Sequence, residues 1–382
     1  MSTFSSLTLL LFLVLSSSAA DTSVTDESTF EREIRKAIQE ELDTYALYFN
    51  TSFSVGIAND RVNFSVVSGI QNHAKDVTLK ENTLIPMGSA TKIYTAVAVL
   101  QAVERGLVGL DDAAYEVVDP FLLRTNGTTL LDLWKDETIN QITIRQLLGM
   151  RACLSDYDDA KLQAFVLDPA NENVTISPLD FIHTWAPKTF VCRPGEGGSY
   201  SSIGYVMLGF VIAGLQNATT WTDVDQRQIL PPVLRSELAD LTFPLLGPCS
   251  AYEHVSHQYA ATFNQIEAPG YWNTIEWLDI FDFSCLNGWT MGNLAATTSD
   301  TSAALYHLFG KHRAPPLLTP SSLEAMQTFK PLTVGWSVGL QYGLGAMRVN
   351  MFPSDEVPSE YTTFVGHPVR LNLRSRSLGM HT

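Results

Sequence analysis

Segments with strand character occur at both ends of this chain, and a long helical region separates them. Residues 52–57 and 62–69 are rich in β-branched and aromatic side chains, and the turn-forming run 58–61 joins them, which predicts a hairpin. Strand character returns at residues 334–349 and 361–369, where Gly343 and Gly345 mark tight or bulged points. A sheet made from both ends, with a large helical insertion between, is an α+β plan.

Helical periodicity fills the rest of the chain. Residues 29–45 carry apolar side chains at helical spacing, which predicts an amphipathic helix ahead of the hairpin. The pattern from about residue 86 to residue 326 is mostly helical. We therefore expect one domain over residues 21–369, with a sheet lobe (21–86 and 327–369) and a helical lobe (87–326), because either lobe alone would leave an apolar face uncovered.

The N-terminus has the features of a secretory leader. Leu7 to Leu15 is an apolar run interrupted only by Thr8, and small residues follow it up to Ala20. This pattern predicts a signal peptide over residues 1–20 and a secreted protein. The run is too short for a transmembrane helix, which needs about 20 apolar residues, so we expect no stable membrane insertion.

The cysteines and glycosylation sequons agree with export. An even number of cysteines in an oxidising compartment favours two disulfides, with three possible connectivities. Of these we expect Cys153–Cys192 with Cys249–Cys285. Sequons that would be surface N-glycosylation sites in a eukaryotic host begin at Asn50, Asn63, Asn126, Asn173 and Asn217.

Charge and motif content exclude several classes of partner. The formal net charge of −16 gives a surface that repels phosphate backbones, so nucleic acid is not an expected partner. The sequence has no CxxC spacing, no Gly-rich phosphate loop and no Gly-x-Ser-x-Gly elbow. His254 and His257 are three residues apart without an acidic base between them. We therefore expect no metal and no cofactor.

Ser89 and Lys92 stand at the start of a predicted helix. Apolar residues recur at helical spacing after them, and Gly106 suits the position after the last turn. Lys92 lies about one turn after Ser89, so their side chains can touch. The positive helix N-terminus favours an oxyanion, and burial would lower the pKa of Lys92 until its amine can accept the serine proton. The alternative is that Ser89 only caps the helix while Lys92 is solvated.

A second motif surrounds Tyr200. Residues 190–209 form a Pro/Gly-rich loop that delivers Tyr200 to the start of an apolar helix. Their types and spacing resemble the Phe-x-Pro-Gly…Tyr-Ser-x-x-Gly-Tyr-x-x-Leu-Gly signature of the serine β-lactamase-related family, which includes class C β-lactamases, D-alanyl-D-alanine carboxypeptidases and esterases. Alternatively, Tyr200 is a loop aromatic that packs on the helix. Further stretches resemble the family in the same order, namely 85–92, 143–148 with 154–157, 291–300, 317–326 and 342–345.

The resemblance, which spans about residues 29–367, implies a β-lactamase/transpeptidase-like fold and a set of roles. Ser89 would attack a carbonyl, with its own N–H as one oxyanion donor. Lys92 and Tyr200 would manage the proton, and the Lys92 ammonium would lower the phenol pKa of Tyr200 from about 10. Ser202, where many members have Asn, and His367 would bind substrate.

The third family motif, at residues 366–369, departs from the pattern. His367 fits, but Val369 replaces a glycine and Pro368 has no N–H for sheet pairing. We expect a truncated or frame-shifted end from about Pro368, with residues 370–382 as an atypical tail.

The leading hypothesis is a secreted serine hydrolase that forms an acyl-enzyme with a small-molecule or peptide substrate containing an amide, β-lactam or ester bond. A non-catalytic binding protein or inactive isoform on the same scaffold is the alternative. A zinc-dependent hydrolase is a third reading with almost no support in the sequence.

Overall fold

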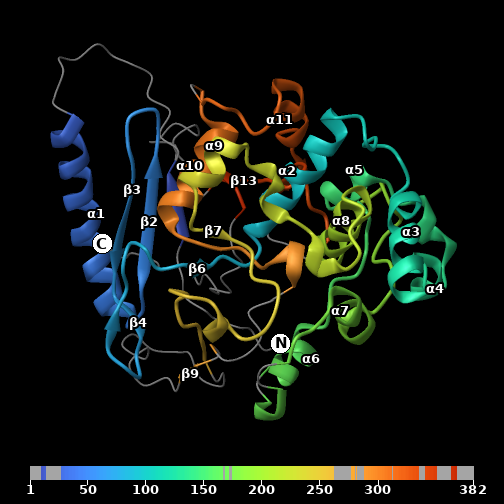
Figure 1. Cartoon of the computed structure of the whole chain (residues 1–382), viewed down its shortest axis with the longest axis horizontal. Helices are drawn as coiled ribbons and strands as arrows, with labels where there is room; N and C mark the ends of the chain where they lie inside the picture. Colours follow the sequence, from blue (N-terminus) through green and yellow to red (C-terminus); the bar gives the residue numbers. More distant parts are fainter. Residues whose placement is uncertain are drawn as a thin grey trace, which may run out of the picture.

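The computed structural model describes residues 10–13, 27–166, 168–171, 174–261, 277–279, 281, 288–311, 313–334, 340–350 and 363–367. The helices are α1 (Glu27–Phe49), α2 (Thr91–Glu104), α3 (Tyr115–Asn126), α4 (Leu130–Trp134), α5 (Ile144–Leu148), α6 (Asp159–Val166), α7 (Pro178–Trp185), α8 (Ser202–Leu215), α9 (Pro232–Glu237), α10 (Thr298–Phe309) and α11 (Pro320–Met326). The longer strands are β1 (Leu10–Leu13), β2 (Phe53–Ala58), β3 (Asn63–Ser68), β13 (Met347–Asn350) and β14 (Thr363–Gly366). The short strands are β4 (Ile70–Asn72), β5 (Val77–Thr78), β6 (Ile85–Pro86), β7 (Leu241–Thr242), β8 (Tyr259–Ala261), β9 (Trp277–Asp279), β10 (Ala295–Ala296), β11 (Lys330–Pro331) and β12 (Gln341–Tyr342). The predicted α+β class is confirmed, with α1 and the β2–β3 hairpin at one side of the molecule and α3, α4 and α5 at the other (Figure 1).

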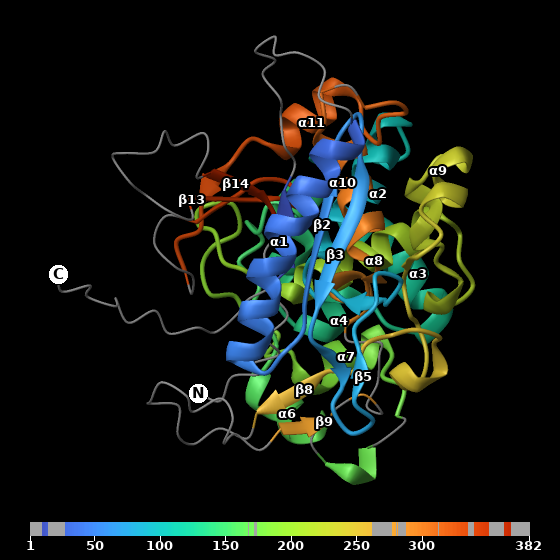
Figure 2. The same ribbon diagram turned by 90° about the vertical axis from the view of Figure 1, so that its left-hand side faces the viewer.

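The predicted N-terminal hairpin and helix form a layered unit. β2 and β3 pair antiparallel along their whole lengths. Val55 and Ile57 point to one face, where they pack with Leu42 of α1. The alternate residue Gly56 faces α10 so closely that an added Cβ would lie 2.0 Å from the carbonyl oxygen of Thr298, so only glycine fits there. The hairpin therefore lies between α1 and α10 (Figure 2).

The apolar N-terminal segment contributes a strand. β1 pairs in parallel with β2, with Leu10 opposite Ser54 and Leu13 opposite Ile57. β1 thus occupies the edge of β2 that β3 leaves open. In the part of the chain that the structure describes, we find no helix with the length and apolar character needed to cross a membrane.

The strands from the C-terminal part form their own antiparallel sheet, in the order β11-β12-β13-β14. The two ends of the chain both supply strands, as predicted, but in the described residues these strands divide between two sheets. The predicted tight points are confirmed: Gly345 has a φ of +91°, and a Cβ on Gly343 would lie 2.0 Å from the carbonyl oxygen of Met326. Residues 335–339 and 368–382, including the expected tail, lie outside the described residues.

The helical part is organised around α8. Its residues from Ser202 to Ala213 are all buried, and it packs against α2, α3 and α5. A helix that is apolar on all sides is a central helix. Four of the five candidate site residues lie at or just before the N-terminal ends of α2 and α8, so the packing of these two helices positions most of the site.

Candidate active site

Ser89 lies in the turn that leads into α2. The predicted helix start is confirmed, because α2 begins at Thr91 and Gly106 follows its end with a φ of +68°. Thr91 Oγ1 fixes the turn by donating to the Gly88 carbonyl (2.6 Å) and accepting from Leu294 N–H (2.9 Å). The Ser89 side chain is half-buried. Its N–H donates to no backbone carbonyl among the described residues, which leaves it available to a substrate oxygen.

Lys92 projects back from the first turn of α2 to Ser89. Its side chain has 0% exposure. The Nζ donates to Ser89 Oγ and to the carbonyl oxygen of Met291, each over 2.9 Å. It also lies 5.0 Å from the ring centre of Tyr200 and 5.8 Å from that of Tyr205. The Lys92 amine is therefore fixed within hydrogen-bonding distance of Ser89 Oγ.

Tyr200 approaches the serine from the segment before α8. Its hydroxyl donates to Ser89 Oγ over 2.9 Å. Backbone contacts hold this segment, since Ser199 N–H donates to the Met150 carbonyl (3.0 Å). Ser89 Oγ is thus the point where the Lys92 amine and the Tyr200 hydroxyl meet.

Burial controls the proton affinities of these groups. Burial lowers the pKa of Lys92 to about 7, and the negative charge of Asp156 opposes this shift. The direction agrees with the prediction. The prediction that Lys92 lowers the pKa of Tyr200 is wrong: burial raises the pKa of the phenol well above its usual value. Tyr200 is therefore a neutral hydrogen-bond donor, because a buried phenolate would lose its hydration.

His367 and Ser202, the two expected substrate contacts, lie beside Tyr200 in different ways. His367 follows β14 with 4% exposure, and its ring centre is 6.0 Å from that of Tyr200 and 5.8 Å from that of Tyr342. Ser202 begins α8 with 5% exposure. The structure thus brings all five predicted site residues into one region.

Asp156 contacts the start of α8 beside the site, although sequence patterns assign it no role beyond its place in a motif. Its Oδ1 accepts from Ser202 N–H (2.8 Å) and from Tyr157 N–H (3.0 Å). Burial raises the pKa of Asp156 to about 6, with the Lys92 charge opposing. The one signal in the sequence is an acidic residue that follows a buried helix and a loop. Its hydrogen-bond partner, Ser202 N–H, lies 46 residues away in the chain, so sequence spacing does not connect the two.

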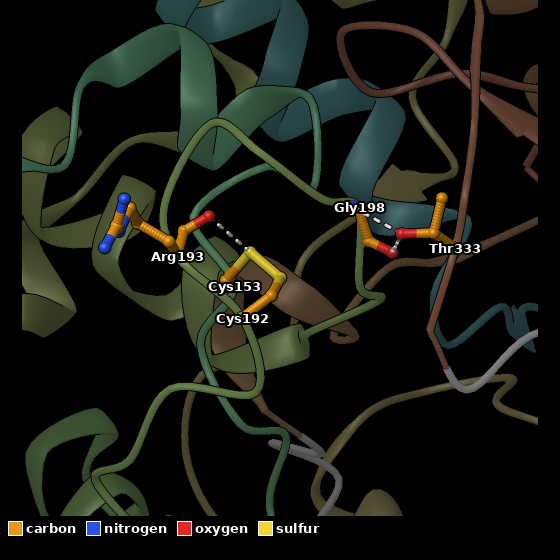
Figure 3. Close-up of a disulfide and its surroundings, with 5 residues drawn as sticks. All are labelled: Cys153, Cys192, Arg193, Gly198 and Thr333. Atoms are coloured by element: carbon orange, nitrogen blue, oxygen red, sulfur yellow. Dashed lines mark hydrogen bonds between the residues drawn. A yellow bond between two sulfur atoms is a disulfide. The ribbon is translucent and has the colours of Figure 1, made fainter.

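A disulfide joins the loops that carry Asp156 and Tyr200. The predicted bridge Cys153–Cys192 is confirmed, with Cα atoms 5.1 Å apart. Close by, Gly198 N–H donates to Thr333 Oγ1 over 3.1 Å (Figure 3). The other expected bridge, Cys249–Cys285, involves a residue outside the described part of the chain.

Removing this bridge with the double variant Cys153→Ala/Cys192→Ala is expected to destabilise the fold. The cysteines are 39 residues apart, and closing a loop of that size stabilises a protein by about 4 kcal/mol through the unfolded chain. Urea unfolding of the variant should show this loss as a lower midpoint, with a slope equal to or steeper than that of the wild type because the unfolded chain is less compact. An unfolding midpoint equal to that of the wild type would contradict the expectation.

His257, the second histidine of the pair noted in the sequence, has polar and aromatic partners away from Ser89. His257 Nδ1 is 2.6 Å from Asp279 Oδ2, and its Nε2 is 2.8 Å from Asn72 Nδ2. Its ring stacks on Phe281, with centres 3.9 Å apart. Among the residues that can be described, no three His, Cys, Asp or Glu side chains gather as metal ligands would.

Comparison with known proteins places this geometry in a family. The sequence model of the Beta-lactamase family matches residues 45–367, a range that holds all five candidate residues. This chain belongs to the Beta-lactamase family. The β-lactamase/transpeptidase-like fold predicted from the motifs is confirmed, and this family is one of serine hydrolases.

Solved structures of the Beta-lactamase fold resemble the chain over most of its length. A D-stereospecific amidohydrolase from Streptomyces sp. superposes with a TM-score of 0.62 at 20% identity, covering 87% of this chain and 86% of that chain. The D-amino acid amidase from Ochrobactrum anthropi SV3, complexed with L-phenylalanine amide, gives 0.63 at 18% identity, covering 89% and 85%. At these identities the likeness establishes the fold.

Curated relatives match shorter stretches. Protein flp of Staphylococcus aureus (strain MW2) is 25% identical over 223 residues, which are 57% of this chain and 40% of that protein. Penicillin-binding protein 4 of Amycolatopsis lactamdurans is 24% identical over 168 residues, covering 44% and 39%. The matches therefore span about two fifths of the length of these relatives.

Proposed function

We propose that this chain is a secreted serine hydrolase that forms an acyl-enzyme on Ser89 with an amide, β-lactam or ester substrate. The observation that carries the proposal is the position of Ser89 Oγ, 2.9 Å from both Lys92 Nζ and the Tyr200 hydroxyl. A serine hydroxyl is a weak nucleophile at neutral pH unless an adjacent base takes its proton. An amine whose pKa is near 7 is such a base.

The reaction follows from these contacts. Neutral Lys92 accepts the proton of Ser89 while Oγ bonds to the substrate carbonyl carbon, and the carbonyl electrons move to the oxygen. The Ser89 N–H near the positive end of α2 stabilises this oxyanion. When the intermediate collapses, the bond to the leaving group breaks, and that group receives the proton from the Lys92 ammonium by way of the Tyr200 hydroxyl. A water molecule then attacks the acyl carbon while Lys92 takes its proton, and Ser89 Oγ recovers a proton as its bond to the acyl group breaks.

Ser202 and His367 are proposed to contact the substrate, which is a small molecule or a peptide. Their places beside Tyr200 support this assignment. Two structural relatives, a D-stereospecific amidohydrolase and a D-amino acid amidase, favour an amide bond within the broader class. No cofactor takes part in the proposed steps.

The purified chain tests the proposal with p-nitrophenyl butyrate and nitrocefin as reporter substrates. We expect hydrolysis of at least one of them, with a burst of coloured product equal to the enzyme when the acyl-enzyme accumulates. Binding of both reporters without turnover would instead support a non-catalytic binding protein on this fold.

Replacing Tyr200 with phenylalanine isolates the role of the hydroxyl. The ring that Lys92 contacts remains, but the donor to Ser89 Oγ is lost, so kcat should fall by roughly 10²- to 10⁴-fold. Tyr306→Phe on α10 is the matched control and should keep the wild-type rate. Equal rates in both variants, measured by steady-state kinetics, would remove Tyr200 from the mechanism.

Secretion is the second part of the proposal. Three features support secretion: the apolar leader, the Cys153–Cys192 disulfide and the exposure of the sequon asparagines. The exposed asparagines are Asn50, Asn63, Asn126 and Asn217. Asn173 lies outside the described residues. Cleavage after Ala20 would remove β1 from the edge of β2. N-terminal sequencing of the exported protein should begin at Asp21, and glycosidase treatment should lower its mass.

A further inference from the structure

Thr95 and Lys92 lie one turn apart on the same face of α2, and both side chains are buried. Lys92 Nζ donates to the carbonyl oxygen of Met291 over 2.9 Å. Thr95 Oγ1 donates to the carbonyl oxygen of the preceding residue, Thr290, over 2.6 Å. A threonine hydroxyl inside a helix often donates to the carbonyl four residues before it. Because a hydroxyl has one proton, Thr95 instead uses it to tie α2 to another segment.

That segment, the short 3₁₀ helix η7 (Trp289–Met291), is also tied to α8. Thr290 Oγ1 donates to the carbonyl oxygen of Tyr205 over 2.8 Å, and Thr290 has 0% exposure. The two helices can approach this closely because Gly209 has no side chain: an added Cβ would lie 2.3 Å from Thr290 Oγ1. Thr290 is therefore bound to α2 through its carbonyl oxygen and to α8 through its hydroxyl.

The backbone of η7 has a conformation that its surroundings must enforce. Trp289 has a φ of +52°, in the left-handed region that bulky residues rarely adopt. Such a conformation persists only where neighbouring contacts determine it. The Trp289 ring is buried, with its centre 5.5 Å from that of Phe210 and 6.1 Å from that of Trp221. This packing and the two threonine bonds fix the direction of the next carbonyl, that of Met291.

The Met291 carbonyl affects Lys92 in two ways. A neutral amine has two N–H bonds and one lone pair, and it accepts the Ser89 proton only when the lone pair faces Oγ. By holding one N–H, the carbonyl limits rotation of the amine about its Cε–Nζ bond. After proton transfer it still accepts from the ammonium. An acceptor for the charged form raises the pKa of an amine, so this contact opposes the lowering that burial causes.

We propose that Thr95 and Thr290 are positioning residues, which hold the Met291 carbonyl against Lys92 so that the lone pair of the amine faces Ser89. This inference rests on the proposed function of Ser89. Neither threonine takes part in the proposed bond-making steps. Each acts through the carbonyl oxygen of Met291.

The variant Thr95→Val tests the proposal, because valine keeps the branched shape but cannot donate to the Thr290 carbonyl. Thr95→Ser keeps the hydroxyl and is the rescue variant. Thr290→Val cuts the bond to α8 instead, so it tests the same set of contacts independently if Thr95→Val does not fold. Thr242→Val is the matched control, since the Thr242 hydroxyl also donates to a backbone carbonyl over 2.6 Å, that of Ala295.

The readout is the pH profile of kcat/KM for p-nitrophenyl butyrate, which reports the ionisation of the Lys92 amine. In the described residues, the titratable groups that face or influence this amine are Tyr200, Tyr205 and Asp156. None of the four variants alters these groups. A shifted midpoint therefore reports the hydrogen bond at Met291 rather than a changed charge.

In Thr95→Val and Thr290→Val we expect the rise of the profile to move from about 7 to lower pH by about one unit, because the ammonium loses a fixed acceptor. The plateau above the rise should fall by about 10- to 100-fold, because the lone pair is no longer aligned with Ser89. Thr95→Ser and Thr242→Val should keep the wild-type midpoint and plateau.

A wild-type midpoint in Thr95→Val or Thr290→Val, even with a lower rate, would overturn the positioning role, and so would an equal shift in Thr242→Val. In either case the butyrate activity of the wild type would still uphold the proposed function. A wild-type chain that does not hydrolyse the ester would overturn the proposed function and this inference with it.

Discussion

Replacing Ser89 with alanine is expected to abolish covalent acylation and to lower kcat/KM by on the order of 10⁴-fold or more, the scale seen when a catalytic nucleophile is removed. The reason is that Ser89 Oγ is the atom on which the Lys92 amine and the Tyr200 hydroxyl converge. Steady-state hydrolysis of p-nitrophenyl butyrate and labelling by an acylating probe measure the effect. The half-buried side chain can be shortened with little change in stability.

Ser68→Ala is the control for this variant. Its hydroxyl donates to Asp43 on the hairpin side of the molecule, so activity should not change. Residual hydrolysis by Ser89→Ala within tenfold of the wild type would mean that another group is the nucleophile.

Replacing Lys92 with methionine should lower kcat/KM by roughly 10²- to 10⁴-fold, because the side chain keeps its approximate length but no longer accepts a proton. The wild-type profile of kcat/KM should rise with pH through about 7, since the buried amine is protonated and inactive below that value. Above it the amine is neutral and the profile should level off. Lys92→Met should show no such rise.

The stability of Lys92→Met should change in the opposite direction from its activity. A lowered pKa in the folded state means that the unfolded chain binds more protons between about pH 7 and pH 10.4, so the buried amine destabilises the fold as pH falls through this window. The penalty is complete below about pH 7. Melting at pH 6 should therefore place the Tm of the variant at or above that of the wild type. A lower Tm together with unchanged activity would show that Lys92 is structural.

Contacts between site residues that are close in the chain can be predicted from the sequence. Ser89 and Lys92 are three residues apart on one helix turn, and helical geometry alone places their side chains within contact distance. Tyr200 is 111 residues away from Ser89, so no spacing rule connects them, and the resemblance to a family was needed. The Cys153–Cys192 pairing was one choice among three connectivities, and the structure confirms it.

Properties that depend on burial could not be predicted in the same way. The pKa of Tyr200 was expected to fall because Lys92 is near, but the tertiary packing that encloses both groups raises it. Asp156 accepts a hydrogen bond from a backbone N–H 46 residues away, a contact that sequence periodicity does not reveal. Likewise, strands at the two ends of the chain were predicted, but their division into two sheets follows from long-range pairing.

The location of the acyl group tests the central claim most directly. The chain is mixed with a slow acylating β-lactam or ester, quenched in acid and digested with trypsin, which should release residues 81–92 as one peptide with Ser89 as its only serine. We predict one acyl group per chain, on this peptide and at Ser89. Turnover of the same reagent with no adduct on Ser89, or with the adduct on another residue, would contradict the account.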